Sequence, residues 1–253
     1  MSADPTKRFS DRVDNYVKYR PGYPIEVIDL LENECGLSAG SAIADIGAGT
    51  GIFTELLLNR KYKVYAVEPN ADMLNAARQQ LGGYENFIPA NGNAEATSLL
   101  TGSIDLVVCA QAFHWFNNER TKVEFKRILK EDAFVALIWN NRLADVDGFS
   151  IAYENLLKQG ATDYNQVNHR NISNIDFEAF FRNGKYKAVK YPNVQVFDED
   201  GFLGRAFSSS YVPSEGTGDG KQFRKILKDM FAQYNKNGRV SFHYQTETYL
   251  GKL

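Results

Sequence analysis

Short apolar runs alternate with amphipathic stretches between residues 41 and 139. The runs are rich in β-branched side chains, as buried parallel strands are, and they predict strands at Ser41–Ile46, Lys63–Val67, Asn86–Ala90, Ile104–Ala110 and Ala133–Trp139. The stretches between them have helical spacing, which predicts helices at Phe53–Asn59, Ala71–Leu81 and Glu119–Leu129. Strands that alternate with helices form right-handed βαβ units, so the pattern predicts an α/β fold with a mostly parallel sheet and helices on both faces.

The segments on either side of this region follow looser patterns. Before it, helices are expected at residues 9–20 and at Ile25–Cys35, separated by Pro21 and Pro24. After Asn140, the spacing predicts helices at Phe149–Gln159, Asp176–Arg182 and Phe223–Asn235, and strands within Lys185–Phe197 and at Val240–Leu250. These strands are expected to add to the edge of the same sheet. No linker rich in Pro, Gly or Ser divides the chain, so we expect a single domain over residues 1–253.

Composition excludes several classes of protein. Hydrophobic residues make up 43% of the chain and aromatic residues 13%, which is enough for a packed core. The net charge is −2, and the most basic run, Lys122–Lys130, is better explained as a solvated helix face than as a nucleic-acid site. Cys35 and Cys109 are too few for a disulfide framework, and the histidines show no metal-ligand spacing, so no metal is expected. Because the chain lacks a bilayer-spanning apolar stretch and a signal-peptide core at its N-terminus, we expect a cytoplasmic protein with no membrane partner.

A glycine-rich loop follows the first expected strand, where Gly47, Gly49 and Gly51 precede a helix. Glycine allows a tight turn and lets a ligand approach the backbone, and the following helix offers N–H groups at its positive end. A dinucleotide fingerprint would need glycine at position 52, where this chain has Ile52, and the Lys-Ser/Thr ending of a P-loop is absent from the sequence. The loop is therefore expected to bind a polar ligand of another kind, with a purely structural turn as the alternative.

Glu68 ends the second expected strand, in the segment Val64-Tyr-Ala-Val-Glu-Pro69. The two oxygens of a carboxylate at this place can accept hydrogen bonds from both hydroxyl groups of a ribose. An exposed acid at a strand end is the alternative interpretation.

The segments Asp45-Ile-Gly-Ala-Gly-Thr-Gly51 and Ala66-Val-Glu-Pro-Asn70, followed by Met73, resemble the class I S-adenosylmethionine-dependent methyltransferases, specifically the small-molecule type 11 group. The resemblance implies a Rossmann-like fold with a mostly parallel seven-stranded sheet, and S-adenosyl-L-methionine as the cofactor. It also implies that the glycine loop lies under the methionine part of the cofactor, that Glu68 holds the ribose, and that Met73 flanks the adenine.

The third motif of the family resembles Gly92-Asn-Ala-Glu95. Asn93 stands where an Asp often reads the adenine amino group, so either its amide or the Ala94 backbone is expected to make that contact. The full set of expected cofactor-binding residues is Tyr19, Arg20, Asp45, Gly47, Ala48, Gly49, Glu68, Pro69, Met73, Asn93, Ala94, Glu95, Gln111 and Ala112. Arg20 is expected either to meet the methionine carboxylate or to cap its helix, and Tyr19, with Tyr16, either to close over the cofactor or to pack in the core.

Four further segments are similar to a trans-aconitate-methyltransferase-like subgroup: Phe9–Pro24, Gln111–Phe116, Trp139–Arg142 and Tyr244–Tyr249. On this resemblance the single methyltransferase domain has three parts. They are an N-terminal helical lid segment at residues 1–36, a cofactor-binding core at 41–140, and substrate-side helices and edge strands at 141–253.

In methyl transfer the cofactor supplies the electrophile, so the protein mainly has to align an acceptor with the methyl group and exclude water. A general base is needed only for a hydroxyl or protonated-amine acceptor, and His114 is the candidate base, with a pocket-wall role as the alternative. The expected acceptor-binding residues are His114, Trp115, Arg142, Arg205 and Tyr211. For the two arginines, the alternatives are a surface cation at Arg142 and a polar turn around Arg205.

These residues predict methyl transfer from S-adenosylmethionine to a small molecule, with a carboxylate as one candidate acceptor. A non-catalytic protein that binds the cofactor as a sensor and a nicotinamide-dependent oxidoreductase are the alternatives, and the oligomeric state is left open.

Overall fold

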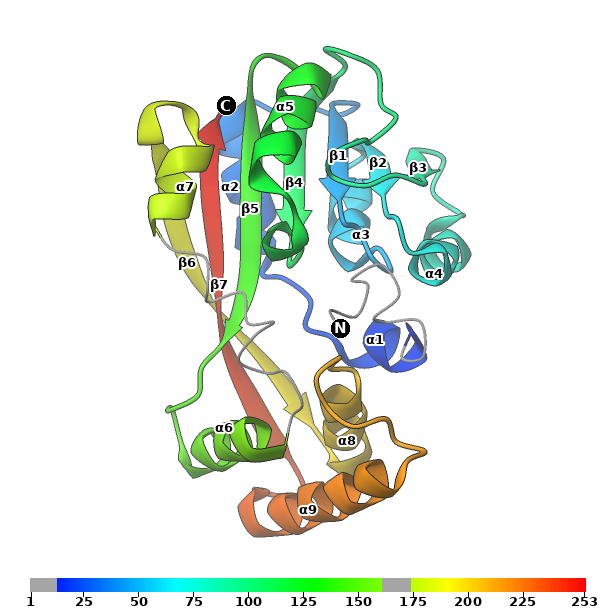
Figure 1. Cartoon of the computed structure of the whole chain (residues 1–253), viewed down its shortest axis with the longest axis vertical. Helices are drawn as coiled ribbons and strands as arrows, with labels where there is room; N and C mark the ends of the chain where they lie inside the picture. The colour runs from blue at the N-terminus through cyan, green and yellow to red at the C-terminus, as the bar shows by residue number, and fades with distance from the viewer. Residues whose placement is uncertain (1–12, 161–173) are drawn as a thin grey trace.

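The computed structural model describes residues 13–160 and 174–253, so the first residues of the helix expected from residue 9 lie outside it. Within these residues, seven strands form one sheet in the order β3-β2-β1-β4-β5-β7-β6 (Figure 1). The strands are β1 (Ala42–Ile46), β2 (Lys63–Val67), β3 (Phe87–Ala90), β4 (Ile104–Ala110), β5 (Leu129–Arg142), β6 (Tyr186–Phe197) and β7 (Val240–Lys252). The first five pair in parallel, as their alternation with helices predicted.

The last two strands make the sheet mixed. β7 runs antiparallel to both of its neighbours and lies between β5 and β6, so only β6 forms the edge. The two C-terminal strands therefore extend the same sheet beyond β5, as expected, with β7 as the inner strand and β6 as the outermost one. Alternate residues of β7 are buried, as the sequence pattern predicted, but that alternation does not distinguish an inner strand from an edge strand.

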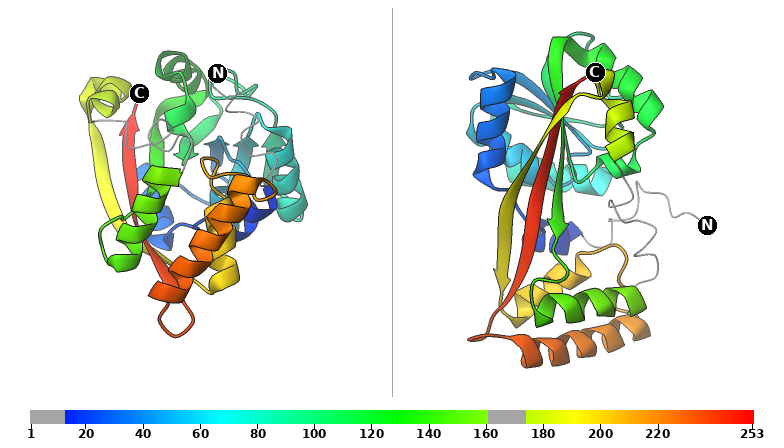
Figure 2. Two further views of the ribbon diagram at one scale, coloured as in Figure 1. Left: turned by 60° about the horizontal axis from the view of Figure 1, so that its bottom comes forward. Right: turned by 90° about the vertical axis from the view of Figure 1, so that its left-hand side faces the viewer.

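Helices cover both faces of the sheet, as expected. In the described part of the chain they are α1 (Val13–Tyr19), α2 (Ile25–Cys35), α3 (Ile52–Asn59), α4 (Ala71–Leu81), α5 (Asn118–Ile128), α6 (Gly148–Gly160), α7 (Asn174–Phe180), α8 (Glu199–Phe207) and α9 (Gly218–Tyr234). One apolar cluster joins α2, α3 and α4 to the sheet, and another joins α5 and α7 to it. The right-hand view of Figure 2 shows α2 and α7 on opposite sides of the strands. Because α2 packs against the sheet, it does not cover the carboxyl edge of the strands. The described residues of the expected lid segment that lie near this edge precede α2.

The strands β5, β6 and β7 run on beyond the rest of the sheet, and α6, α8 and α9 gather around their far end (Figures 1 and 2). We call these three helices the cap. A separate apolar cluster holds the cap together, and aromatic rings dominate it. The rings of Phe149 and Phe242 lie 5.2 Å apart and those of Phe149 and Phe202 lie 5.4 Å apart, both edge to face.

Helix α8 is an element that the sequence pattern missed. Phe202, Leu203 and Ala206 have helical spacing and are buried, but Gly201 and Gly204 interrupt the pattern. The second glycine is required by packing, because a Cβ atom at Gly204 would lie 2.1 Å from a ring carbon of a tyrosine in α1. Arg205 follows this glycine within the helix, so the alternative that Arg205 lies in a polar turn is wrong.

Candidate functional site

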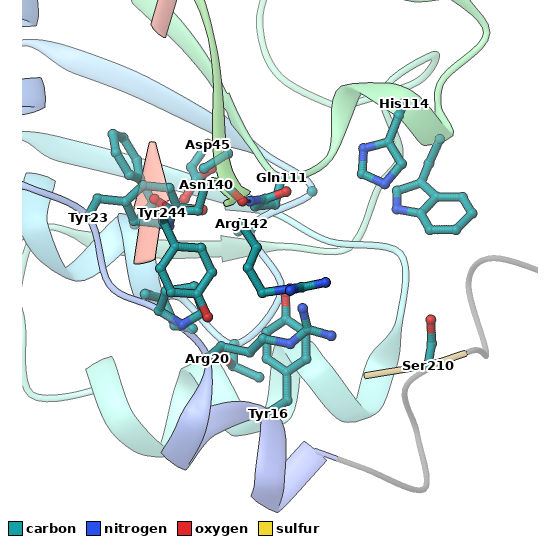
Figure 3. Close-up of a pocket in the computed structure, with 18 of the residues that line it drawn as sticks. Tyr16, Arg20, Tyr23, Asp45, Gln111, His114, Asn140, Arg142, Ser210 and Tyr244 are labelled. Atoms are coloured by element: carbon teal, nitrogen blue, oxygen red, sulfur yellow. Dashed lines mark hydrogen bonds between the residues drawn. The ribbon is translucent and has the colours of Figure 1, made fainter. Parts of the chain in front are cut away.

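Two adjoining cavities lie where the parallel strands end, and a cap residue, Arg205, lines one of them. We call the first the loop cavity; its volume is about 240 Å³, and the glycine loop, Glu68 and Met73 help to line it. We call the second the arginine cavity; its volume is about 150 Å³, and Figure 3 shows residues that line it. Four residues border both cavities: Tyr16, Gly47, Gln111 and Trp115. One ligand can therefore extend through both cavities. Their place at the carboxyl ends of the parallel strands is where ligands bind in open α/β sheets.

The glycine loop shapes the floor of both cavities. Gly47 has φ +74°, and a Cβ atom there would lie 2.5 Å from the Cβ of Ala112. Gly51 has φ +88°, and a Cβ atom there would lie 2.5 Å from Leu81 Cδ1. Both glycines are therefore needed for a left-handed backbone and for a close approach of two elements. α3 begins directly after the loop, and its first residues, Ile52 and Phe53, line the arginine cavity, so the positive end of the helix dipole lies beside the ligand space.

Glu68 holds the loop while it faces the loop cavity. Its Oε2 accepts a hydrogen bond from Gly49 N–H at 2.9 Å, and its Oε1 accepts one from Asn70 N–H at 2.9 Å. Burial raises the pKa of the Glu68 carboxyl above its ordinary value, although both backbone hydrogen bonds favour the ionised form. Each carboxylate oxygen has a further lone pair, so both can still accept hydrogen bonds from a ligand.

The far wall of the loop cavity comes from Pro69, Met73 and the segment Asn93–Glu95. Asn93 Oδ1 already accepts the backbone N–H groups of Glu95 at 3.0 Å and Ala96 at 2.8 Å. Both lone pairs of that oxygen are therefore used to shape the turn. The Asn93 amide oxygen is therefore not suited to accept a hydrogen bond from an adenine amino group. The Ala94 backbone remains the expected partner for that group.

Asp45 is the penultimate residue of β1, lines the arginine cavity and is 1% exposed. Its Oδ2 accepts a hydrogen bond from Thr54 Oγ1 at 2.6 Å, and the backbone N–H of Thr54 also favours the ionised carboxylate, whereas Oδ1 is buried with no partner at hydrogen-bond geometry among the described residues. Burial raises the pKa of the Asp45 carboxyl to about 7, and the nearby Glu68 raises it as well. A buried acceptor without a partner, next to a cavity, is suited to a ligand that donates a hydrogen bond or carries a positive charge.

His114 lies in a short 3₁₀ turn after β4 and borders the arginine cavity (Figure 3). Its Nδ1 accepts a hydrogen bond from Trp139 Nε1–H at 3.4 Å. An indole N–H can only donate, so Nδ1 must present its lone pair and the proton of a neutral imidazole lies on Nε2. The second ring nitrogen of His114 is therefore a hydrogen-bond donor.

Arginines from three different elements line the arginine cavity. Arg142, at the end of β5, is 9% exposed, and its Nη2 lies 2.6 Å from Glu154 Oε2 of α6. Arg205, in α8, is 6% exposed and donates through Nε to Tyr244 Oη at 3.1 Å. Arg20 donates through Nη2 to the main-chain oxygen at the C-terminus of α8, while its Nε is buried without a partner among the described residues.

These arginines shift the pKa values of neighbouring groups. Burial raises the pKa of the Tyr211 hydroxyl, but Arg205, Arg20 and Arg142 outweigh it and the net pKa is lowered. Burial and the nearby Arg205 lower the pKa of Arg20 itself. Asp45 is the only acid in the described lining of the arginine cavity, and Glu154 already pairs with Arg142, so Arg20 and Arg205 supply most of the positive charge that suits this cavity to an anion.

The two cavities contain all but one of the expected site residues. Tyr19 is the exception: its ring packs edge to face on Phe197 at 6.3 Å and against Gly204, and it lies outside both cavities. One turn earlier in α1, Tyr16 borders both. The periodicity of a short helix does not show which of two tyrosines faces inward.

Sequence reasoning also missed several lining residues of the arginine cavity, namely Tyr23, Thr50, Asn140 and Tyr244. Asn140 lies within the segment Trp139–Arg142 that carried part of the family resemblance, so a signal was present for it. Its side chain links three elements, because Nδ2 donates to Gly22 O at 3.0 Å and Oδ1 accepts from Thr246 Oγ1 at 2.5 Å.

No group of His, Cys, Asp and Glu in residues 13–160 and 174–253 has the arrangement of a metal site. No helix in the same ranges is long and apolar enough to cross a bilayer.

Known proteins with similar sequences are methyltransferases by name. Residues 44–137 match the family described as "Methyltransferase domain". An uncharacterized methyltransferase-like protein of Schizosaccharomyces pombe is 37% identical over 137 residues, which are 54% of this chain and 52% of that protein. An uncharacterized methyltransferase of Mycobacterium tuberculosis is 36% identical over 139 residues, which are 55% of this chain and 54% of that protein. The chain thus spans about half the length of the curated relatives it matches.

Solved structures extend the likeness of the fold to almost the whole chain. A proposed type II methyltransferase from Anaeromyxobacter dehalogenans has a TM-score of 0.68 at 20% identity and covers 92% of this chain and 98% of that one. A phosphoethanolamine N-methyltransferase of Haemonchus contortus in complex with S-adenosyl-L-methionine has a TM-score of 0.56 at 14% identity, over 99% of this chain and 60% of that one. Residues 44–137 therefore match a methyltransferase domain, and the fold of the described residues is similar to that of solved methyltransferases.

Proposed function

We propose that this chain binds S-adenosylmethionine across the loop cavity and the arginine cavity and methylates a small anionic molecule, with a carboxylate as the acceptor group. The observation that carries the proposal is the convergence of Arg20, Arg142 and Arg205 on one cavity that adjoins the glycine loop.

The residues present fit the cofactor on three counts. Glu68 offers two acceptor oxygens to a ribose diol, and the space between Met73 and Ala94 suits an adenine ring. Asp45 Oδ1, which is buried without a partner among the described residues, suits the methionine ammonium group. Arg20 suits the methionine carboxylate, since its buried Nε is also without a described partner. When bound, S-adenosylmethionine supplies a methyl group on a positively charged sulfur that is already a good electrophile.

The acceptor is assigned to the remaining part of the arginine cavity, between Trp115 and the cap. Arg205 and Tyr211 reach it from the cap, and Arg142 reaches it from β5. A carboxylate is ionised at neutral pH, so its methylation requires no general base. The Nε2–H of His114 suits this acceptor as a hydrogen-bond donor that helps to hold it in line with the methyl group.

A labelled-methyl assay tests the proposal. Wild-type protein is incubated with methyl-labelled S-adenosylmethionine and a panel of small organic acids, each beside its neutral amide. We expect label to transfer to at least one acid and not to its amide, and Arg205→Met to lower kcat/KM for that acid by at least about tenfold. Lys225→Met, which removes an exposed cation from α9, is the matched control and should leave the rate unchanged.

Equal labelling of acids and amides would contradict an anionic acceptor. Binding of the cofactor with no labelled product across the panel would instead favour a sensor.

His114 is tested in the same assay. We expect His114→Ala to lower turnover of the acid by less than about tenfold and to leave the shape of the pH–rate profile unchanged, because the imidazole removes no proton. A loss of about a thousandfold together with loss of a limb of the profile would restore His114 as a general base.

A further inference from the structure

Gln111 has an unusual backbone conformation at the place where the two cavities meet. It follows β4 with φ +57°, in the left-handed region that a residue with a side chain rarely adopts. Its backbone N–H donates to Ile138 O at 2.8 Å, which anchors it to the neighbouring strand. Residues held in this conformation are strained, and they cluster at functional sites.

The orientation of the Gln111 amide follows from its partner. Its Nε2 donates to the main-chain oxygen of Asn140 at 3.1 Å. A carbonyl oxygen cannot donate a hydrogen bond, so the NH₂ group must face Asn140 and Oε1 must face away from it. Among the described residues, none donates a hydrogen bond to Gln111 Oε1. In the view of Figure 3, Gln111 lies on the cavity wall between Asn140 and His114.

This oxygen is at the boundary between the proposed adenosine and methionine parts of the cofactor site, because Gln111 lines both cavities. In S-adenosylmethionine the sulfur joins those two parts. A ligand that fills both cavities therefore brings its sulfur to the boundary, next to the residues that the cavities share.

We infer that the side-chain oxygen of Gln111 contacts the sulfonium group of S-adenosylmethionine and makes the site prefer it over S-adenosylhomocysteine, an inference that rests on the proposed function. The partial negative charge of an amide oxygen attracts the sulfonium, which becomes a neutral thioether once the methyl group has left. A full carboxylate charge would hold the reactant more tightly than the transition state, in which the positive charge is already fading. A neutral amide is therefore suited both to orient the methyl group and to release the product.

The test is the ratio of two dissociation constants, for S-adenosylhomocysteine and for S-adenosylmethionine, measured by titration calorimetry. Gln111→Met removes the oxygen and should lower this ratio about threefold. Gln111→Glu adds a charge and should raise the ratio about tenfold while it lowers kcat. Any disturbance of the contact with Asn140 affects both ligands alike and cancels in the ratio.

Gln245→Glu is the control, because it adds the same charge on β7 outside both cavities, and it should leave the ratio unchanged. An unchanged ratio in both Gln111 variants would overturn the inference. If the wild-type protein bound neither ligand, the proposed function itself would fail.

Discussion

At the scale of single residues, Asp45 gives the protein a measurable dependence on pH. Its carboxyl has a pKa of about 7 in the folded chain, against an ordinary value of 3.8, because it is buried. A raised pKa means that the folded state binds the proton more tightly than the unfolded state does. The stability that the protonated carboxyl contributes is therefore fully present below pH 3.8 and is lost as the pH rises through about 7.

Asp45→Asn removes this titration and keeps an oxygen that can accept the Thr54 hydrogen bond. We expect the free energy of unfolding of the variant to rise relative to wild type by about 2–4 kcal/mol between pH 4 and pH 8. Urea unfolding at a series of pH values measures the difference. Parallel curves for the two proteins would show that Asp45 is ionised in the free protein throughout this range.

At the scale of elements, the segment that links α1 to α2 ties the core to the cap. We call residues 19–23 the strap. Asn193 Nδ2 donates to Gly22 O at 2.9 Å, and Gln195 Nε2 donates to Tyr19 O at 3.1 Å, both from β6. Through Arg20 the strap also reaches the C-terminus of α8. The strap borders the arginine cavity and not the loop cavity.

Asn193→Ala removes one of these anchors. We expect it to weaken binding of S-adenosylmethionine about threefold to tenfold, which corresponds to one hydrogen bond, and to leave binding of adenosine unchanged. Adenosine lacks the methionine part and so does not reach the strap. Gln245→Ala, on the opposite face of the neighbouring strand, is the control for both ligands. Equal weakening of both ligands would argue against a role of the strap in holding the methionine part.

The elements of the core were predictable from sequence because each has a simple period. The five parallel strands and the helices between them were placed to within a few residues, apart from the longer β5. The glycine loop and Glu68 could be recognised because local spacing sets their positions. The place of β7 and the helix at Glu199–Phe207 could not be predicted, since both depend on contacts between distant segments. Tyr19 was wrongly expected in the site because its contacts with Phe197 and Gly204, which are distant in sequence, decide where its ring lies.

At the scale of the whole molecule, a buried ion pair joins the core to the cap. Arg142 belongs to β5 and Glu154 to α6, and both side chains are at most 10% exposed. Removing one member of such a pair leaves the other charge buried without compensation. Lys158 also lies near Glu154, at 3.5 Å, but its side chain is 55% exposed, so its contribution is expected to be small.

We expect Glu154→Gln to lower the free energy of unfolding by about 3 kcal/mol. Arg142→Met in the same chain should restore part of the loss, since no charge is then left buried. Lys158→Met should change the stability by less than about 1 kcal/mol. If Glu154→Gln and Lys158→Met were equally mild in urea unfolding, the ion pair would not contribute to holding the cap on the core.

The two-cavity arrangement as a whole depends on the cofactor, and Glu68 is the residue by which its binding is most directly tested. The decisive measurement is a calorimetric titration of S-adenosylmethionine into wild type, Glu68→Ala and the exposed control Glu85→Ala. We expect one site per chain in wild type and in Glu85→Ala, and an affinity at least about tenfold weaker in Glu68→Ala, because the ribose loses its charged acceptor. The same affinity in Glu68→Ala as in wild type, or no binding to wild type at all, would contradict this expectation.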